Sequence, residues 1–151
     1  MNKAATSTIE RDIRDTALNL LARREHSLLE LHHKLTRRGF DSATVMPVLQ
    51  QLITDGWLDE QRFADVYASA RIDKGYGPLR IQRELRERGI DDAIIDNILV
   101  NLADLWQTKL QQLCQRRLGA PKNLADKARQ QRFLRHRGFT FEQINQHFRD
   151  H

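Results

Sequence analysis

The chain has 151 residues, of which 40% are hydrophobic and 30% are charged, so it has enough apolar side chains to fold as one domain or as several small units. Its single cysteine excludes a disulfide framework and a thiolate metal cluster, and its few prolines and glycines argue against a turn-rich β protein. No apolar run approaches the roughly 20 residues that a membrane span needs, and the N-terminus lacks the apolar segment of a secretory signal. We therefore expect a cytoplasmic protein that does not interact with a membrane.

The net charge of +5 is concentrated in the second half of the chain. Residues 1–75 carry equal numbers of acidic and basic side chains, whereas residues 109–137 hold nine basic residues against Asp126 alone. A uniformly solvated surface is not expected to segregate charge in this way. The pattern indicates an anionic partner, either a polyanion or an acidic protein surface.

A short motif occurs three times along the chain: Leu-x-x-Arg-Gly followed by an apolar residue. Its glycines are Gly39, Gly89 and Gly138, about 50 residues apart. Apolar side chains recur at the sixth and tenth positions after each glycine. Three copies in register indicate three copies of one structural unit.

Each motif predicts two helices joined by a tight turn. Glycine adopts the left-handed conformation that ends a helix, and Asp41, Asp91 or Thr140 then stands where the next helix needs an N-cap. Ser7, Ser27 and Thr140 each precede Glu or Gln by three residues, which is the spacing of a capping box. A further helix is expected before each motif, over residues 8–25, 60–74 and 104–118. No segment has the pattern of a strand.

The sequence therefore predicts an all-α protein built from three tandem three-helix repeats. We place the repeats at residues 8–55, 57–103 and 104–151, of which the third is the most basic.

Arginines form a row on the middle helix of the second and third repeats, at nine, six and three residues before the glycine. At about 100° per residue, each row spans about 120° of the helix and points away from its apolar stripe. The rows are Arg80, Arg83 and Arg86, and Arg129, Arg132 and Arg135. The first repeat has no such row.

The two rows differ in their acidic neighbours. Glu84 and Glu87 are available as partners in the second repeat, so an ordinary charged helix face explains that row equally well. Only Asp126 is close in the third repeat, which favours an anion-binding surface there. Arg38, Arg88 and Arg137 recur at the end of their helices, where a cation complements the helix dipole, and we expect them to be structural.

Sequence motifs typical of catalysis are missing. There is no phosphate-binding loop, Cys114 is expected to be a small buried residue, and His26, Glu30 and His33 lack further metal ligands nearby. We expect no enzyme activity, no cofactor and no metal.

Several stretches together resemble the RecX family of bacterial recombination regulators, over essentially the whole chain. They are Gly56-Trp57-Leu58-Asp59, Arg62-Phe63-Ala64, Tyr76-Gly77-Pro78-Leu79-Arg80-Ile81, Glu84-Leu85, Arg88-Gly89-Ile90, Arg132-Phe133-Leu134 and Arg137-Gly138-Phe139. The third repeat departs from the pattern at Gln130, where an apolar residue would continue the stripe formed in the other repeats by Leu31 and Ile81. This departure bears on the packing of that helix and on the direction of its arginine row.

The resemblance implies a cytoplasmic modulator that binds the RecA recombinase and its filament on single-stranded DNA. Such a protein limits filament extension, and with it ATP hydrolysis, strand exchange and co-protease activity. The resemblance also implies an elongated, curved array of three tri-helical repeats, without an ATP site or a metal. The protein is expected to lie in the groove of the filament or at its growing end, and a monomer fits this arrangement.

The expected contacts with DNA phosphates or acidic RecA surface come from ten side chains: Arg80, Arg83, Arg86, Arg116, Arg117, Lys122, Lys127, Arg129, Arg132 and Arg135. Two alternatives remain. One is a stand-alone DNA-binding module of the helix-turn-helix type, although its arginines would lie before the turn rather than on the helix that follows it. The other is a scaffold with incidental charge.

Overall fold

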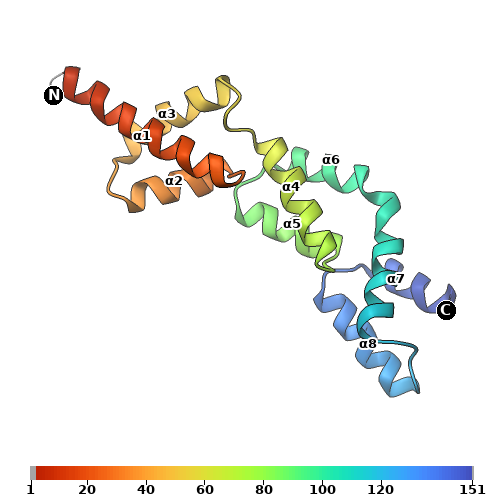
Figure 1. Cartoon of the computed structure of the whole chain (residues 1–151). Helices are drawn as coiled ribbons and strands as arrows, with labels where there is room; N and C mark the ends of the chain where they lie inside the picture. Colours follow the sequence, from red (N-terminus) through yellow and green to blue (C-terminus); the bar gives the residue numbers. More distant parts are fainter. Residues whose placement is uncertain (1–2, 151) are drawn as a thin grey trace. The chain divides into compact units, whose positions relative to one another are not determined.

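The computed structural model describes residues 3–150, with side chains from Ser7 onward, and over these residues it contains α-helices and one 3₁₀-helix but no strand (Figure 1). The elements are α1 (Lys3–Arg23), α2 (Leu28–Arg37), α3 (Ser42–Thr54), α4 (Glu60–Asp73), α5 (Pro78–Glu87), α6 (Asp92–Asn101), the 3₁₀-helix η1 (Ala103–Leu105), α7 (Trp106–Arg117), α8 (Leu124–His136) and α9 (Phe141–Asp150). The all-α prediction is confirmed.

The chain divides into two compact units. The first takes in the chain up to Val66 together with Arg88–Ile90, and the second takes in Tyr67–Glu87 and the chain from Asp91 onward. The division falls within α4 and does not correspond to the three predicted repeats, so the repeat boundaries stay predictions. His151, the last residue of the third predicted repeat, lies outside the described residues.

In the first unit, α1, α2 and α3 pack against one another around an apolar core. The core is formed by Ile13, Ala17, Leu20, Leu31, Leu35, Val45, Leu49, Leu52 and Leu58, all less than 7% exposed. On α2 the buried residues are four apart, which is the spacing that keeps side chains on one face of a helix.

The predicted turns and caps are largely present. Gly39, Gly89 and Gly138 all have φ between +79° and +98°, the left-handed region that glycine enters without steric cost. Ser27 and Glu30 form a reciprocal capping box, with both hydrogen bonds at 3.1 Å. Asp41 and Asp91 stand at the N-cap of their helices, but their side chains make no capping hydrogen bond.

The third repeat also has its capping box, because Thr140 Oγ1 accepts from the Gln143 N–H and Gln143 Oε1 accepts from the Thr140 N–H. The capping box expected at Ser7 is wrong. Helix α1 already begins at Lys3, so Ser7 lies inside it. The alanines at 4 and 5 are strong helix formers and extend the helix past the expected start.

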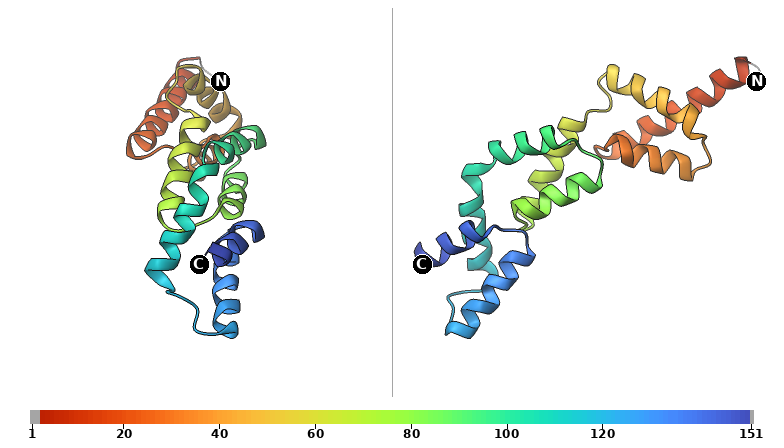
Figure 2. Two further views of the ribbon diagram at one scale, coloured as in Figure 1. Left: turned by 90° about the vertical axis from the view of Figure 1, so that its right-hand side faces the viewer. Right: turned by 180° about the vertical axis from the view of Figure 1, so that it is seen from behind.

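In the second unit, α9 packs against both α7 and α8 (Figure 2, dark blue). Leu110, Leu134, Phe139 and Ile144 are buried there. Gln130 is also buried, with 1% exposure, and its Nε2 donates to the Gly119 carbonyl at 3.2 Å. The hydrogen bond of its amide therefore lets Gln130 lie on the buried face of α8. The buried face of α8 is formed at the same positions as in the other middle helices, α2 and α5.

Two turns of the second unit meet through their backbones. The Gly77 N–H donates to the Arg137 carbonyl at 2.8 Å, and the Leu79 N–H donates to the Gly138 carbonyl at 2.9 Å. A Cβ on Gly77 would lie 2.6 Å from the Gly138 carbonyl carbon, which is closer than real Cβ contacts come. Only glycine at position 77 permits this approach, which joins the start of α5 to the end of α8.

Candidate functional site

A buried carboxylate organises the start of α5. Glu84, which is 8% exposed, accepts hydrogen bonds from Arg71 Nε at 2.8 Å and from Arg71 Nη2 at 2.9 Å. It also accepts from the Tyr67 hydroxyl at 3.0 Å and from Arg80 Nε at 3.4 Å. Burial raises the pKa of Glu84, but these hydrogen bonds outweigh it, and the pKa lies below its ordinary value of 4.5.

Three guanidinium groups surround the ring of Tyr76 beside this carboxylate. Their carbons lie 3.9 Å (Arg71), 4.6 Å (Arg80) and 4.6 Å (Arg137) from the ring centroid, within the range of cation–π attraction. Arg137 Nη1 also donates to the Lys74 carbonyl at 3.0 Å. Arg137 therefore contacts the turn that follows α4, in addition to standing at the end of its own helix as predicted.

The prediction that Arg80 points away from the core is wrong. Its side chain is only 23% exposed, because it lies against Glu84 and Tyr76. The prediction treated α5 as an isolated helix. In the structure the turn at Gly138 packs against the start of α5 and encloses Arg80.

Arg83 and Arg86 are exposed, as predicted, but each has an acidic partner. Arg83 lies 3.8 Å from Glu87, and Arg86 lies 2.8 Å from Asp92. Both pairs are more than half exposed, so each acidic partner partly offsets the positive charge without burying it.

On α8, Asp126 is engaged by its own helix and by the loop that precedes it. Its carboxylate accepts from the Lys122 N–H at 2.9 Å and from Arg129 Nη2 at 2.7 Å. These two hydrogen bonds, that from the Lys122 backbone first, hold the pKa of Asp126 below its ordinary value. The single acidic residue of this segment is therefore paired with Arg129.

Apart from Lys109, which pairs with Asp73 at 3.5 Å, the other basic residues of the segment have no acidic partner among the described residues. Arg116 and Arg117 at the end of α7, and Arg132 and Arg135 on α8, are exposed and make no ion pair with the described residues. Lys122 is exposed in the preceding loop, and the Nζ of the half-buried Lys127 lies 5.5 Å from the ring centroid of Phe148. These charges are available to a partner.

Arg116 and Arg117 meet other basic groups at a cleft of about 390 Å³. Lys74 and Arg137 line the same cleft, with Asp73 as its acidic residue. Lys74 was not a candidate from the sequence, because it belongs to the turn after α4 and only the fold brings it to α7.

Phe141, the first residue of α9, was also not a candidate from the sequence. Its side chain is large and apolar but 63% exposed, and the Arg135 guanidinium carbon lies 3.6 Å from its ring centroid. A groove of about 350 Å³ runs between α8 and α9 at this point. Its lining consists of Ala128, Gln131, Arg132, Arg135, Phe141, Ile144 and Asn145.

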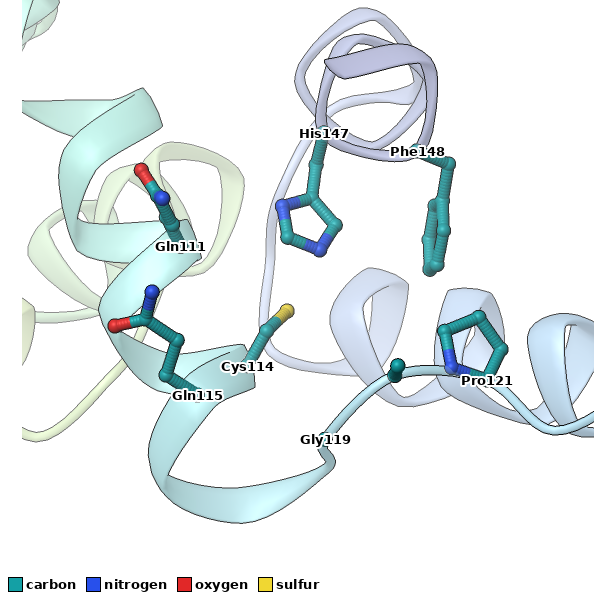
Figure 3. Close-up of a pocket in the computed structure, with 8 residues that line it drawn as sticks. Gln111, Cys114, Gln115, Gly119, Pro121, His147 and Phe148 are labelled. Carbon is teal, nitrogen blue, oxygen red and sulfur yellow. The ribbon is translucent and has the colours of Figure 1, made fainter. Parts of the chain in front are cut away.

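A smaller pocket of about 190 Å³ lies between α7, the loop after it and α9 (Figure 3). Cys114 points its sulfur into this space, facing His147 and Phe148 (Figure 3). Burial raises the pKa of the Cys114 thiol to about 11, so it is protonated at neutral pH and is not an activated nucleophile.

No group of three or more His, Cys, Asp or Glu side chains among the described residues is arranged to hold a metal ion. None of the described helices combines the length and the apolar character that a membrane crossing requires.

Family models match three consecutive stretches of the chain. They describe the first three-helix domain of RecX at residues 14–52, the second at 59–99 and the third at 105–148. The chain is 46% identical over 134 residues to the regulatory protein RecX of Halorhodospira halophila, covering 87% of this chain and 83% of that protein. It is 40% identical to the regulatory protein RecX of Pseudomonas syringae pv. tomato, covering 87% and 86%.

Solved structures have the same fold. A crystal structure of regulatory protein RecX matches with a TM-score of 0.85 at 20% identity, covering 100% of this chain and 80% of the other. RecX from Lactobacillus salivarius matches with a TM-score of 0.81 at 19% identity, covering 95% and 97%. With three domain models in sequence order and relatives at 40–46% identity, this chain belongs to the RecX family of regulatory proteins.

Proposed function

We propose that this protein is a negative modulator of the RecA recombinase, which acts in the cytoplasm as a monomer and without catalysis of its own. It binds RecA and the RecA filament on single-stranded DNA, and it limits filament extension, ATP hydrolysis, strand exchange and co-protease activity. Membership in a family of regulatory proteins supports a regulatory role.

The observation that carries the binding surface is the set of arginines without acidic partners in the third repeat. Arg116, Arg117, Arg132 and Arg135 are exposed and unpaired among the described residues. A guanidinium stays charged and offers several donors, so it binds phosphate oxygens or carboxylates well. Lys122, Lys127 and Arg129 enlarge this basic surface.

Arg83 and Arg86 extend the surface more weakly in our proposal. Each must exchange its present carboxylate for the partner's anion, which reduces the net gain. Arg80 contributes through the structure, because it holds the junction between α5 and the turn at Gly138.

A stand-alone helix-turn-helix module fits the charge distribution less well. A recognition helix follows the turn, but the unpaired arginines of α8 precede it. Helix α9, which follows the turn, begins with Glu142 in its first turn. Contacts from α8 and α7 to phosphates are expected to be independent of base sequence.

The test is removal of unpaired charge. We expect Arg132→Ala with Arg135→Ala to weaken binding to the RecA filament and to single-stranded DNA. The concentration of this double variant that is needed to inhibit RecA ATP hydrolysis should rise by at least about tenfold. The matched control is Arg11→Ala with Arg37→Ala, which removes the same charge from exposed positions of α1 and α2. Equal loss in both double variants would reduce the effect to net charge, and no loss in the first would contradict the proposed surface.

A further inference from the structure

The groove between α8 and α9 carries a more specific inference, which rests on the proposed function. We propose that Phe141, with Arg132 and Arg135 beside it, is a stacking site for a base of single-stranded DNA.

Phe141 is more exposed than the other large apolar side chains of α9. On α9, Ile144 is buried and Phe148 is half-buried against the rest of the unit, whereas Phe141 leaves 63% of its side chain in solvent. The fold does not use this ring for its core. An exposed phenylalanine beside a groove has a free apolar surface that a flat ligand can cover.

The guanidinium of Arg135 lies over the ring of Phe141. The guanidinium carbon lies 3.6 Å from the ring centroid, which is stacking distance. This contact favours one orientation of the ring before any ligand arrives, which reduces the side-chain freedom lost on binding. A base that stacks on the exposed part of the ring lies next to a fixed positive charge.

The groove beside Phe141 is lined by basic, amide and apolar side chains. Its side chains are two arginines, the amides of Gln131 and Asn145, and apolar groups; none of its described lining residues is a carboxylate. Arg132 and Arg135 are suited to the phosphates on either side of a stacked base. Aromatic rings combined with a basic groove are the usual means by which proteins hold single strands without reading sequence.

The geometry favours a single strand over other anions. Bases in a duplex are already stacked on both faces and do not reach a surface ring, whereas a single strand exposes its bases. An acidic protein segment would satisfy the arginines but need not bring a flat group to the exposed ring, whereas every nucleotide of a single strand carries one. We therefore assign the groove to DNA rather than to the surface of RecA.

The experiment compares Phe141→Ala with the unaltered protein on two fluorescent oligonucleotides of equal length and charge. One is oligo-dT and the other has abasic tetrahydrofuran residues in place of the nucleosides. Loss of one stacked base is expected to weaken binding to oligo-dT about tenfold in anisotropy titrations. Binding to the abasic strand, which retains only the phosphates, is expected to be the same for both proteins.

Two further variants control for folding and give a direct signal. Leu124→Ala removes another exposed apolar side chain of the same unit, 84% exposed and outside the groove, and should bind oligo-dT normally. Phe141→Trp should retain affinity, and its added fluorescence should be quenched by oligo-dT but not by the abasic strand.

Three results would overturn the base site: Phe141→Ala binds oligo-dT normally, it loses affinity for both strands equally, or it loses affinity for the RecA filament alone. The last result would assign the groove to protein. Failure of the proposed function is separate, because it is seen when the unaltered protein does not reduce RecA ATP hydrolysis. The difference between oligo-dT and the abasic strand is measured without RecA.

Discussion

Glu84 accepts two hydrogen bonds from Arg71, with Nε to Oε1 at 2.8 Å and Nη2 to Oε2 at 2.9 Å. This two-point ion pair joins the end of α4 to α5, and the carboxylate is 8% exposed. The same guanidinium lies over Tyr76, where Arg80 and Arg137 also converge. One carboxylate thus sits among the positive charges that join α4, α5 and the end of α8.

Glu84→Gln is expected to destabilise the second unit by about 3 kcal/mol, because it leaves a largely buried Arg71 without its counter-charge. Urea unfolding followed by circular dichroism measures the change. The matched control is Glu87→Gln on the same helix, whose exposed pair with Arg83 should contribute no more than about 0.5 kcal/mol. Equal effects of the two substitutions would contradict a structural role for Glu84.

His26 is expected to make the first unit less stable as the pH falls below about 6.5. It is 1% exposed, its Nδ1–H donates to the Arg24 carbonyl at 2.9 Å, and its Nε2 accepts from Lys34 Nζ at 2.8 Å. Burial, and then the positive charges of Arg24 and Lys34, lower its pKa below 6.5. The unfolded chain therefore takes up a proton that the folded chain rejects, and stability present above pH 6.5 is lost below it.

The loss can reach about 1.4 kcal/mol per pH unit until the pH falls below the pKa of folded His26. Thermal unfolding between pH 5 and pH 8 measures it. His26→Gln should remove this part of the pH dependence whatever its effect at pH 8, whereas His33→Gln, at an exposed position of α2, should retain it. An unchanged slope in His26→Gln would show that other groups cause it.

Gly138→Ala is expected to cost more stability than Gly39→Ala. Both glycines have nearly the same φ, +98° and +97°, so both substitutions carry the penalty of about 1–2 kcal/mol for a left-handed alanine. A Cβ at Gly39 meets nothing within 4 Å, whereas one at Gly138 would lie 2.5 Å from Arg80 Cβ. The overlap at Gly138 should lower the free energy of unfolding by about 1 kcal/mol more, which urea unfolding measures. Equal losses would mean that the turns separate without cost.

Salt dependence distinguishes phosphate contacts from other binding. Each phosphate contact on a single strand contributes about 0.7 to the slope of log K against log salt concentration. Arg132→Ala with Arg135→Ala should therefore lower this slope by about 1.4 on oligo-dT. Phe141→Ala should lower the affinity with little change in slope, because stacking releases no counterions. A full slope in the arginine double variant would place the phosphates elsewhere.

Cys114 is expected to react slowly with thiol reagents in the native protein. The thiol is 4% exposed, and with a pKa of about 11 its thiolate fraction is about two to three orders of magnitude below that of a free cysteine. The absorbance released from Ellman's reagent should rise slowly in buffer and promptly in urea. Prompt labelling of the native protein would mean that the pocket in Figure 3 opens readily.

Local signals predicted the turns and most caps. Gly39, Gly89 and Gly138 need no distant partner to end a helix, and the reciprocal hydrogen bonds of Ser27 with Glu30 span three residues. The helix types and the three-fold repeat followed from these signals.

The site was predicted less completely, because its residues depend on contacts between helices. The row pattern placed Arg83, Arg132 and Arg135 outward correctly, but it did not show that the turn at Gly138 encloses Arg80. The groove beside Phe141 exists only where α8 and α9 meet. One ion pair could have been predicted from the sequence, because Asp126 and Arg129 are three residues apart on one helix.

The meeting of Gly77 and the turn at Gly138 has a consequence for divergence within the family. Its two hydrogen bonds use only main-chain atoms, so substitution of an exposed side chain elsewhere on α8 or α9 does not remove a partner from them. A relative that keeps both glycines can exchange the arginines of α8 or the ring of Phe141 and still present its own residues at the same spacing from α5. Substitution on this surface can then change which partner is preferred while the spacing between the turn and α5 is kept.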